Sequence, residues 1–110
     1  MITEAQIIVN RFSQYQKMVL TKIFVAPTEK VAGEEISKGK HLVSARDHLV
    51  KQQMITFDKE NETASLTDKG NQALKDAGLV DDSDTITEEG KKFAYKKVYE
   101  SFIDYFLKTE

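Results

Sequence analysis

The stretch LVSARDHLVKQQMITFDKENETASLTDKGNQAL, residues 42–74, decides the fold of this protein. Its first part predicts a helix over His41–Met54, because Leu42, Ala45 and Leu49 recur on one side at helical spacing. The opposite side of that helix carries only polar residues, which are Lys40, His41, Ser44, Asp47, His48 and Lys51. One face therefore belongs to a core and the other faces water or a partner.

Two short apolar runs follow this helix and predict a β-hairpin. They are Ile55–Phe57 and Ala64–Leu66, and the polar residues Asp58–Glu62 between them form the tip. Thr67 then caps a further helix that ends at Gly78. A helix, a hairpin and a second helix thus follow one another without a long linker.

The transition from strand to helix occurs twice in the sequence. Leu66–Gly70 reads LTDKG and Ile86–Gly90 reads ITEEG, so each has an apolar residue, a threonine, an acid and a glycine in the same order. One repetition is too little for a repeat array, which needs about three units. We interpret it as the same transition used at two places.

Helices are also predicted on both sides of this central stretch. Thr3 and Gln6 form a capping box, and Pro27 ends the helix that starts there. The apolar stripe of that helix is Ala5, Ile8, Phe12, Tyr15, Val19 and Ile23. Thr28 caps a shorter helix that Gly39 follows. A last helix runs from about 88 to 107 and holds six of the ten aromatic residues.

Composition limits the class of protein. A chain of 110 residues favours one domain, and the absence of cysteine excludes a disulfide scaffold, a thiolate zinc site and a cysteine nucleophile. No apolar run is long enough to cross a membrane, so we expect a cytoplasmic protein. Residues 1–57 hold eight basic and five acidic residues, a net charge of +3, whereas residues 58–110 hold eight basic and 13 acidic residues, a net charge of −5.

The order of elements resembles a known family. The helix, the hairpin and the transition at Leu66–Gly70 look like the recognition helix, wing and following helix of winged helix-turn-helix regulators, of the MarR and PadR sort. The resemblance covers about residues 12–78, and it is carried by Leu49, Met54, Ile55 and Leu66–Gly70. It implies a mainly α fold with a small two-stranded β-wing, in a single domain over 1–110 with a core at about 12–80.

The resemblance also implies a function. Members of this family regulate transcription by binding double-stranded DNA, and here the recognition helix, about residues 40–53, would enter the major groove. Carried over position by position, the residues that would face DNA are Lys38, Lys40, His41, Ser44, His48, Lys51 and Lys59. Lysines suit phosphates, whereas Ser44 and the histidines offer hydrogen bonds to base edges.

Three features depart from the family pattern. Gln53 stands where a glycine usually ends the recognition helix, and Arg46 stands where the family often has an aliphatic residue. We expect Arg46 to lay its aliphatic stem on the core and to place its charged head at the edge. The wing tip is acidic, and Lys59 is its single basic residue.

A homodimer is a further expectation. Regulators of this kind dimerise through terminal helices outside the DNA-binding core, and the predicted interface residues here are Tyr95, Tyr99, Phe102 and Phe106. The alternative is that the two terminal helices pack on each other within one monomer. Exposed apolar patches of this size usually mark partner surfaces.

Other functions compete with DNA binding. A winged helix can instead serve as a protein–protein interaction module that does not bind DNA, which the acidic tip and the net charge of −2 favour. No motif indicates an enzyme or a cofactor. His41 and His48 lie about 10 Å apart along a helix, too far to share one metal ion without a third element.

Overall fold

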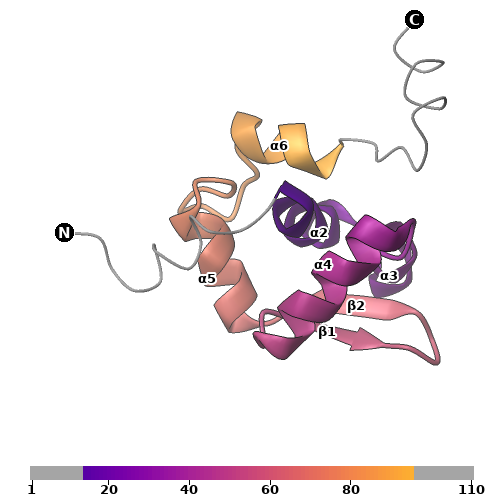
Figure 1. Ribbon diagram of the computed structural model, residues 1–110. Coiled ribbons are helices and arrows are strands. Elements are labelled where there is room, and N and C mark those ends of the chain that lie inside the picture. The colour runs from indigo at the N-terminus through magenta and orange to yellow at the C-terminus, as the bar shows by residue number, and fades with distance from the viewer. Residues whose placement is uncertain (1–13, 96–110) are drawn as a thin grey trace, which may run out of the picture.

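The computed structural model describes residues 14–95 (Figure 1). Within that range the protein is mainly α, with five helices and one two-stranded antiparallel sheet. In chain order the elements are α2 (Gln14–Val25), α3 (Glu29–Glu35), α4 (Lys40–Lys51), β1 (Ile55–Asp58), β2 (Thr63–Leu66), α5 (Asp68–Asp76) and α6 (Glu88–Ala94). The helix predicted from about 88 to 107 is shorter than expected, because α6 ends at Ala94 and Tyr95 has left the helical conformation. The residues after Tyr95, like the capping box at Thr3, lie outside the described residues.

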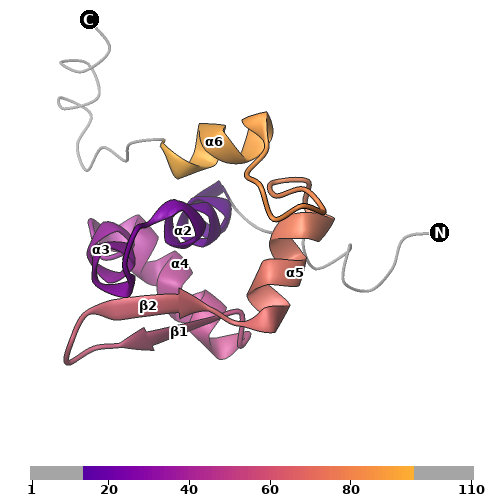
Figure 2. The ribbon, with the colours of Figure 1, turned by 180° about the vertical axis from the view of Figure 1, so that it is seen from behind.

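Helix α2 is the centre of the structure. It contacts α3, α4, α5, α6 and β2, and Figures 1 and 2 show it between α6 and α4 from both sides. Met18, Val19 and Leu20 are fully buried in the core. Thr21 is buried with them because its hydroxyl donates to the carbonyl of Lys17, at 2.8 Å, and so keeps a hydrogen bond without water.

Helices α3 and α4 follow α2 as predicted. Thr28 caps α3 by accepting a hydrogen bond from the amide of Val31, at 3.1 Å. Gly39, with φ of 95°, lies at the start of α4 and turns the chain between the two helices. Gly33 packs against the hairpin so closely that a Cβ there would lie 1.8 Å from the carbonyl oxygen of Glu62.

The predicted hairpin is confirmed. Ile55 pairs with Leu66 and Asp58 with Thr63, which leaves four residues at the tip. The Asp58 carboxylate accepts hydrogen bonds from the side-chain amide of Asn61, at 2.8 Å, and from the amide of Glu60, at 2.9 Å. These bonds favour the charged carboxylate and lower the pKa of Asp58.

The helix predicted over His41–Met54 ends earlier than expected. α4 stops at Lys51, and Gln53 has a left-handed backbone with φ of 62°. The amide of Gln53 donates to the carbonyl of Val50, and the amide of Met54 to that of Leu49, both at 3.0 Å. This closing turn directs the chain out of the helix and into β1, so the last predicted turn is not helical.

The chain repeats this arrangement after α5. Gly78, with φ of 74°, occupies the place of Gln53, and the amide of Leu79 donates to the carbonyl of Leu74 at 3.0 Å. Val80 then forms an isolated antiparallel bridge with Ile86, as Ile55 pairs with Leu66 in the hairpin. A second and smaller hairpin therefore links α5 to α6.

The two threonines that begin α5 and α6 have matching contacts, which confirms the interpretation of the repeated sequence. The hydroxyl of Thr67 donates to the carbonyl of Gln53, and that of Thr87 to the carbonyl of Gly78, both at 2.7 Å. Each hydroxyl oxygen accepts from a glycine amide three residues later, at 3.1 Å. The same local rule thus produces both transitions.

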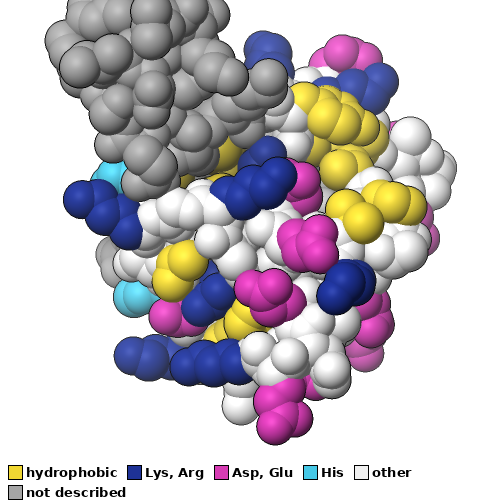
Figure 3. All heavy atoms as spheres, turned by 90° about the vertical axis from the view of Figure 1, so that its right-hand side faces the viewer, with side chains coloured by type: hydrophobic (Ala, Val, Ile, Leu, Met, Phe, Trp, Pro, Cys, Tyr) yellow, Lys and Arg dark blue, Asp and Glu magenta, His cyan; other side chains and the backbone are white. Residues whose placement is uncertain are grey.

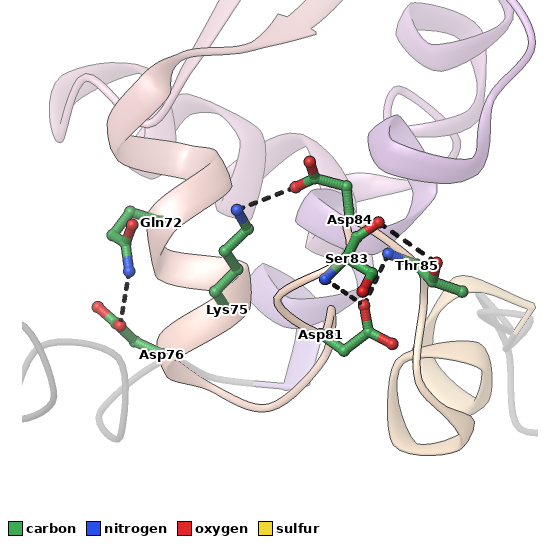
Figure 4. A network of polar contacts seen from close by, with 7 residues as sticks. All are labelled: Gln72, Lys75, Asp76, Asp81, Ser83, Asp84 and Thr85. Carbon is green, nitrogen blue, oxygen red and sulfur yellow. Dashed lines mark hydrogen bonds and ion pairs between the residues drawn. The ribbon is translucent and has the colours of Figure 1, made fainter.

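The loop of the smaller hairpin is held by an acidic network (Figure 4). The Asp81 carboxylate accepts hydrogen bonds from the amides of Ser83, at 2.9 Å, and Thr85, at 3.0 Å. Asp84, with φ of 59°, forms an ion pair with Lys75 of α5 at 2.9 Å and raises the pKa of that lysine. These two acids are therefore committed to holding the loop against α5.

Candidate nucleic-acid interface

Helix α4 presents one buried face and one exposed face, as its sequence predicts. Leu42, Ala45 and Leu49 are buried in the core. The exposed residues include all six polar positions of the opposite side, namely Lys40, His41, Ser44, Asp47, His48 and Lys51. Whether these residues touch DNA stays a prediction, but the structure leaves them accessible.

Two rows of basic side chains run along the exposed face of α4. We call them the lysine row, Lys40 and Lys51, and the histidine row, His41 and His48. At about 100° per residue the two rows point roughly 80° apart, with Ser44 between them. In Figure 3 histidine and Lys or Arg side chains follow the left edge of the molecule, the side on which α4 lies.

The charge of the lysine row is not neutralised. Within residues 14–95 neither Lys40 nor Lys51 has a carboxylate oxygen within 4 Å of its amino group, whereas Lys30, Lys75 and Lys91 each do. Asp47 is the one acid on the exposed face of α4, and its carboxylate pairs with Arg46 at 3.1 Å. The face as a whole is therefore positive, and its acid is occupied.

Arg46 is more buried than the sequence predicts. Only 9% of the residue is exposed, so its head is covered at the edge of the core, where it still reaches the exposed carboxylate of Asp47. The guanidinium lies over the ring of Phe57, 4.1 Å from the ring centre, and donates to the hydroxyl oxygen of Ser37 at 2.9 Å. A single side chain thus connects α4 with β1 and with the turn after α3.

Tyr15 belongs to the candidate site, although the sequence does not predict it there. It belongs to the apolar stripe predicted for the first helix, yet it is 36% exposed, and its ring stacks on His41 with centres 4.8 Å apart and planes 13° apart. Together with Gln16 and the side chains of α4 it lines a shallow groove. No spacing in the sequence relates Tyr15 to His41, because only the packing of α2 on α4 brings them together.

The other two predicted DNA contacts, Lys38 and Lys59, lie close to acidic side chains. Lys38 is exposed, but its amino group pairs with Glu35 at 2.9 Å. Lys59 is exposed at the hairpin tip beside Asp58, Glu60 and Glu62, which are exposed as well. Lys38 would have to break its ion pair with Glu35 to bind a phosphate. The charge of Lys59 is outweighed by the three acidic side chains around it at the hairpin tip.

The backbone at the start of α4 adds to the positive face. Gly39 provides no side-chain cap, so the first amides of the helix have no side-chain acceptor at that position. Helix N-termini of this kind attract anions, because unpaired amides and the helix dipole act in the same direction. Lys40 lies in this first turn.

Only part of the predicted dimer interface can be placed. Tyr95 follows α6 and is 67% exposed. Tyr99, Phe102 and Phe106 lie outside the described residues. Both the dimer and the packed-monomer alternatives therefore stay predictions.

Neither a metal site nor a membrane span accompanies this surface in the part of the chain that the structure describes. Among residues 14–95 no three His, Cys, Asp or Glu side chains come together in a way that would hold a metal ion. Over that range, too, no helix has the length and the apolar character needed to cross a membrane.

The candidate site therefore consists of the exposed face of α4, the start of that helix, the first turn of α2 with Tyr15 and Gln16, and the tip of the hairpin. Comparison of the chain with protein-family models, with curated proteins and with solved structures gives no match.

Proposed function

We propose that this protein is a sequence-specific regulator of transcription that binds double-stranded DNA as a winged helix-turn-helix. In this proposal α3 and α4 are the helix-turn-helix, α4 enters the major groove, and the β1–β2 hairpin is the wing. The observation that carries it is the exposed face of α4, where Lys40 and Lys51 have no carboxylate partner among residues 14–95 and Asp47 is paired with Arg46.

Each part of this face suits a different part of DNA. The lysine row and the uncapped amides at Gly39 suit backbone phosphates, which fix the position of the helix without reading sequence. Ser44 lies at the centre of the exposed face, where its hydroxyl can both donate to and accept from base edges. The acids at the hairpin tip oppose the backbone, so we expect modest affinity for a single copy.

Two copies binding together would raise that affinity. We propose a homodimer that reads two half-sites about one helical turn apart, with Tyr95 and the aromatic residues that follow it as the interface. Sedimentation equilibrium of the full chain measures this directly. A monomer at micromolar concentration would contradict the dimer and leave the DNA proposal to be tested alone.

Binding to a random-sequence duplex, measured by fluorescence anisotropy over a range of salt concentrations, tests the DNA proposal. We expect Lys40→Ala with Lys51→Ala to weaken binding and to reduce the slope of log K against log salt by about 0.9 for each phosphate that the variant no longer neutralises. The matched control is Lys91→Ala with Lys92→Ala, which removes the same charge from α6 on the other side of α2. Equal slopes for the two double variants would contradict the proposal that the exposed face of α4 contacts the DNA backbone.

A second candidate function is a winged-helix module that binds another protein. The exposed acids Asp58, Glu60 and Glu62 at the hairpin tip favour it, because they present a negative surface that DNA would repel. A wild-type chain that ignores the duplex even at low salt would support this candidate. A search for a basic protein partner would then use Glu60→Lys with Glu62→Lys as the variant expected to lose it.

A further inference from the structure

The groove between α2 and α4 has the chemistry of an anion site. Its lining residues are Tyr15 and Gln16 from α2 and His41, Ser44, Ala45 and His48 from α4. Five of these six side chains can donate a hydrogen bond, and no carboxylate of residues 14–95 lines the groove. Its volume of about 150 Å³ is at least ten times the roughly 10–15 Å³ that one water molecule needs, so the groove has room for a group the size of a phosphate.

The position of this groove relates it to the lysine row. The lysine row and the histidine row flank Ser44 on neighbouring sides of α4, about 80° apart. A helix lying in a groove about 12 Å wide approaches a backbone strand on each side. With Ser44 aimed at the base edges, the lysine row leans toward one strand and the histidine row leans toward the other.

We propose that the α2–α4 groove binds a backbone phosphate of DNA through His41 and His48, with Tyr15 as the residue that positions His41. This inference rests on the proposed function, and it assigns the histidines to the backbone instead of to base edges. It also extends the DNA-binding surface from α4 to the start of α2.

Tyr15 acts through its ring. The stack on His41, with planes 13° apart, holds the imidazole in one orientation before a ligand arrives. Holding a side chain in its bound geometry strengthens binding because less freedom is lost on association. Tyr15→Phe keeps the ring and the stack, whereas Tyr15→Leu keeps an apolar side chain and removes the stack.

The chain offers a direct probe, because His41 and His48 are its only two histidines. Their Cε1–H signals in a proton–carbon NMR spectrum of the full chain report on the groove alone. We expect two duplexes of unrelated sequence to shift both signals in the same way, because a phosphate contact does not depend on sequence. Inorganic phosphate is the second probe and shows whether a free anion suffices.

The variants test the positioning role. We expect Tyr15→Leu to weaken duplex binding by about three- to tenfold, which is the scale of one hydrogen bond. Tyr15→Phe should stay within about twofold of the wild type. Thermal unfolding of both variants must stay close to that of the wild type at the temperature of the assay. Equal affinities for the two variants would overturn the role of Tyr15.

The outcomes separate this inference from the function on which it rests. Duplex binding by anisotropy with unmoved histidine signals overturns the phosphate site and leaves the DNA proposal standing. Histidine shifts that differ between the two duplexes assign the row to bases and also overturn it. Shifts with inorganic phosphate but no duplex binding overturn both proposals and make the groove a site for free phosphate.

Discussion

Arg46 is the residue at which α4, β1 and the turn after α3 meet. Its planar guanidinium lies over the Phe57 ring while one edge donates to Ser37 and another pairs with Asp47. An aliphatic residue at this place would fill the space but would not join the turn after α3 to the hairpin. The charged residue at this buried position thus has a structural reason.

Replacing Arg46 by lysine tests this reason. We expect Arg46→Lys to lower the free energy of unfolding by about 1–2 kcal/mol, because an ammonium group cannot stack flat and reach Ser37 at once. Urea denaturation measures the change. The matched control is Lys51→Arg on the exposed face, expected within about 0.5 kcal/mol of the wild type. Equal stability of both variants would contradict the account.

Gln53 has a left-handed backbone that glycine adopts more readily. Its φ of 62° is close to the φ of 74° at Gly78, and both residues occupy the same place after a helix. A residue with a Cβ in this conformation destabilises the fold by about 1–2 kcal/mol. Glycine avoids this strain, but its unfolded chain has more conformational entropy, which offsets part of the gain.

Exchanging the two residue types tests the equivalence. We expect Gln53→Gly to stabilise the protein by about 0.5–1 kcal/mol and Gly78→Gln to destabilise it by a similar amount. A Cβ at Gly78 would meet no atom of residues 14–95 within 4 Å, so the backbone conformation alone accounts for the second effect. Denaturation of the two variants under one set of conditions gives both values, and a loss of stability in Gln53→Gly would contradict the argument.

At the scale of the elements, two glycines allow helices to approach the chain that precedes them. A Cβ at Gly70 would lie 2.0 Å from the carbonyl oxygen of Met54, and a Cβ at Gly90 would lie 2.1 Å from that of Leu79. Those oxygens accept the amides of Thr67 and Thr87, so neither can move without breaking the start of a helix.

Alanine at either glycine should therefore be costly. We expect Gly70→Ala and Gly90→Ala each to lower the free energy of unfolding by about 3 kcal/mol, since the clash is with backbone. Gly78→Ala, in open space, should cost about 1 kcal/mol. Circular dichroism during thermal unfolding ranks the three variants, and equal melting temperatures would show that the transitions tolerate a side chain.

At the scale of the whole molecule, α6 closes the structure over α2. The amino group of Lys22 donates to the carbonyl of Ala94 at 3.0 Å, and that of Lys17 lies 5.4 Å from the centre of the Phe93 ring. Burial of Lys22 disfavours its charge and lowers its pKa, while the nearby carboxylate of Glu35 opposes this shift. The contact thus holds two distant parts of the chain together at an electrostatic cost.

That cost predicts a pH dependence. Because the pKa of Lys22 is lower in the folded state than the ordinary 10.5, the unfolded state binds more protons between the two values. The stability of the wild type relative to Lys22→Met should therefore rise as the pH increases toward 10.5. Urea denaturation of both proteins at pH 7 and near pH 10 measures the difference. A difference that stays constant or falls would contradict the burial argument.

The described part of the fold was largely predictable because its signals are local. Apolar spacing located the core face of α4, Thr28, Thr67 and Thr87 marked helix starts, and the alternation of polar and apolar runs located the hairpin. The end of α4 was misjudged by one turn, because Gln53 adopts a backbone that the residue type does not indicate. The exposed lysines and histidines were likewise evident from helical spacing alone.

Contacts between distant segments were decided only by the tertiary structure. Packing of α2 on α4 placed Tyr15 against His41, and packing of α4 on the hairpin buried the head of Arg46 over Phe57. Neither pair has a spacing that the chain reveals. The sequence by itself determined where the helices and the hairpin form, because caps and periodicity act within a few residues. The shape and charge of the candidate site depended on how those elements pack, because side chains far apart in the chain meet there.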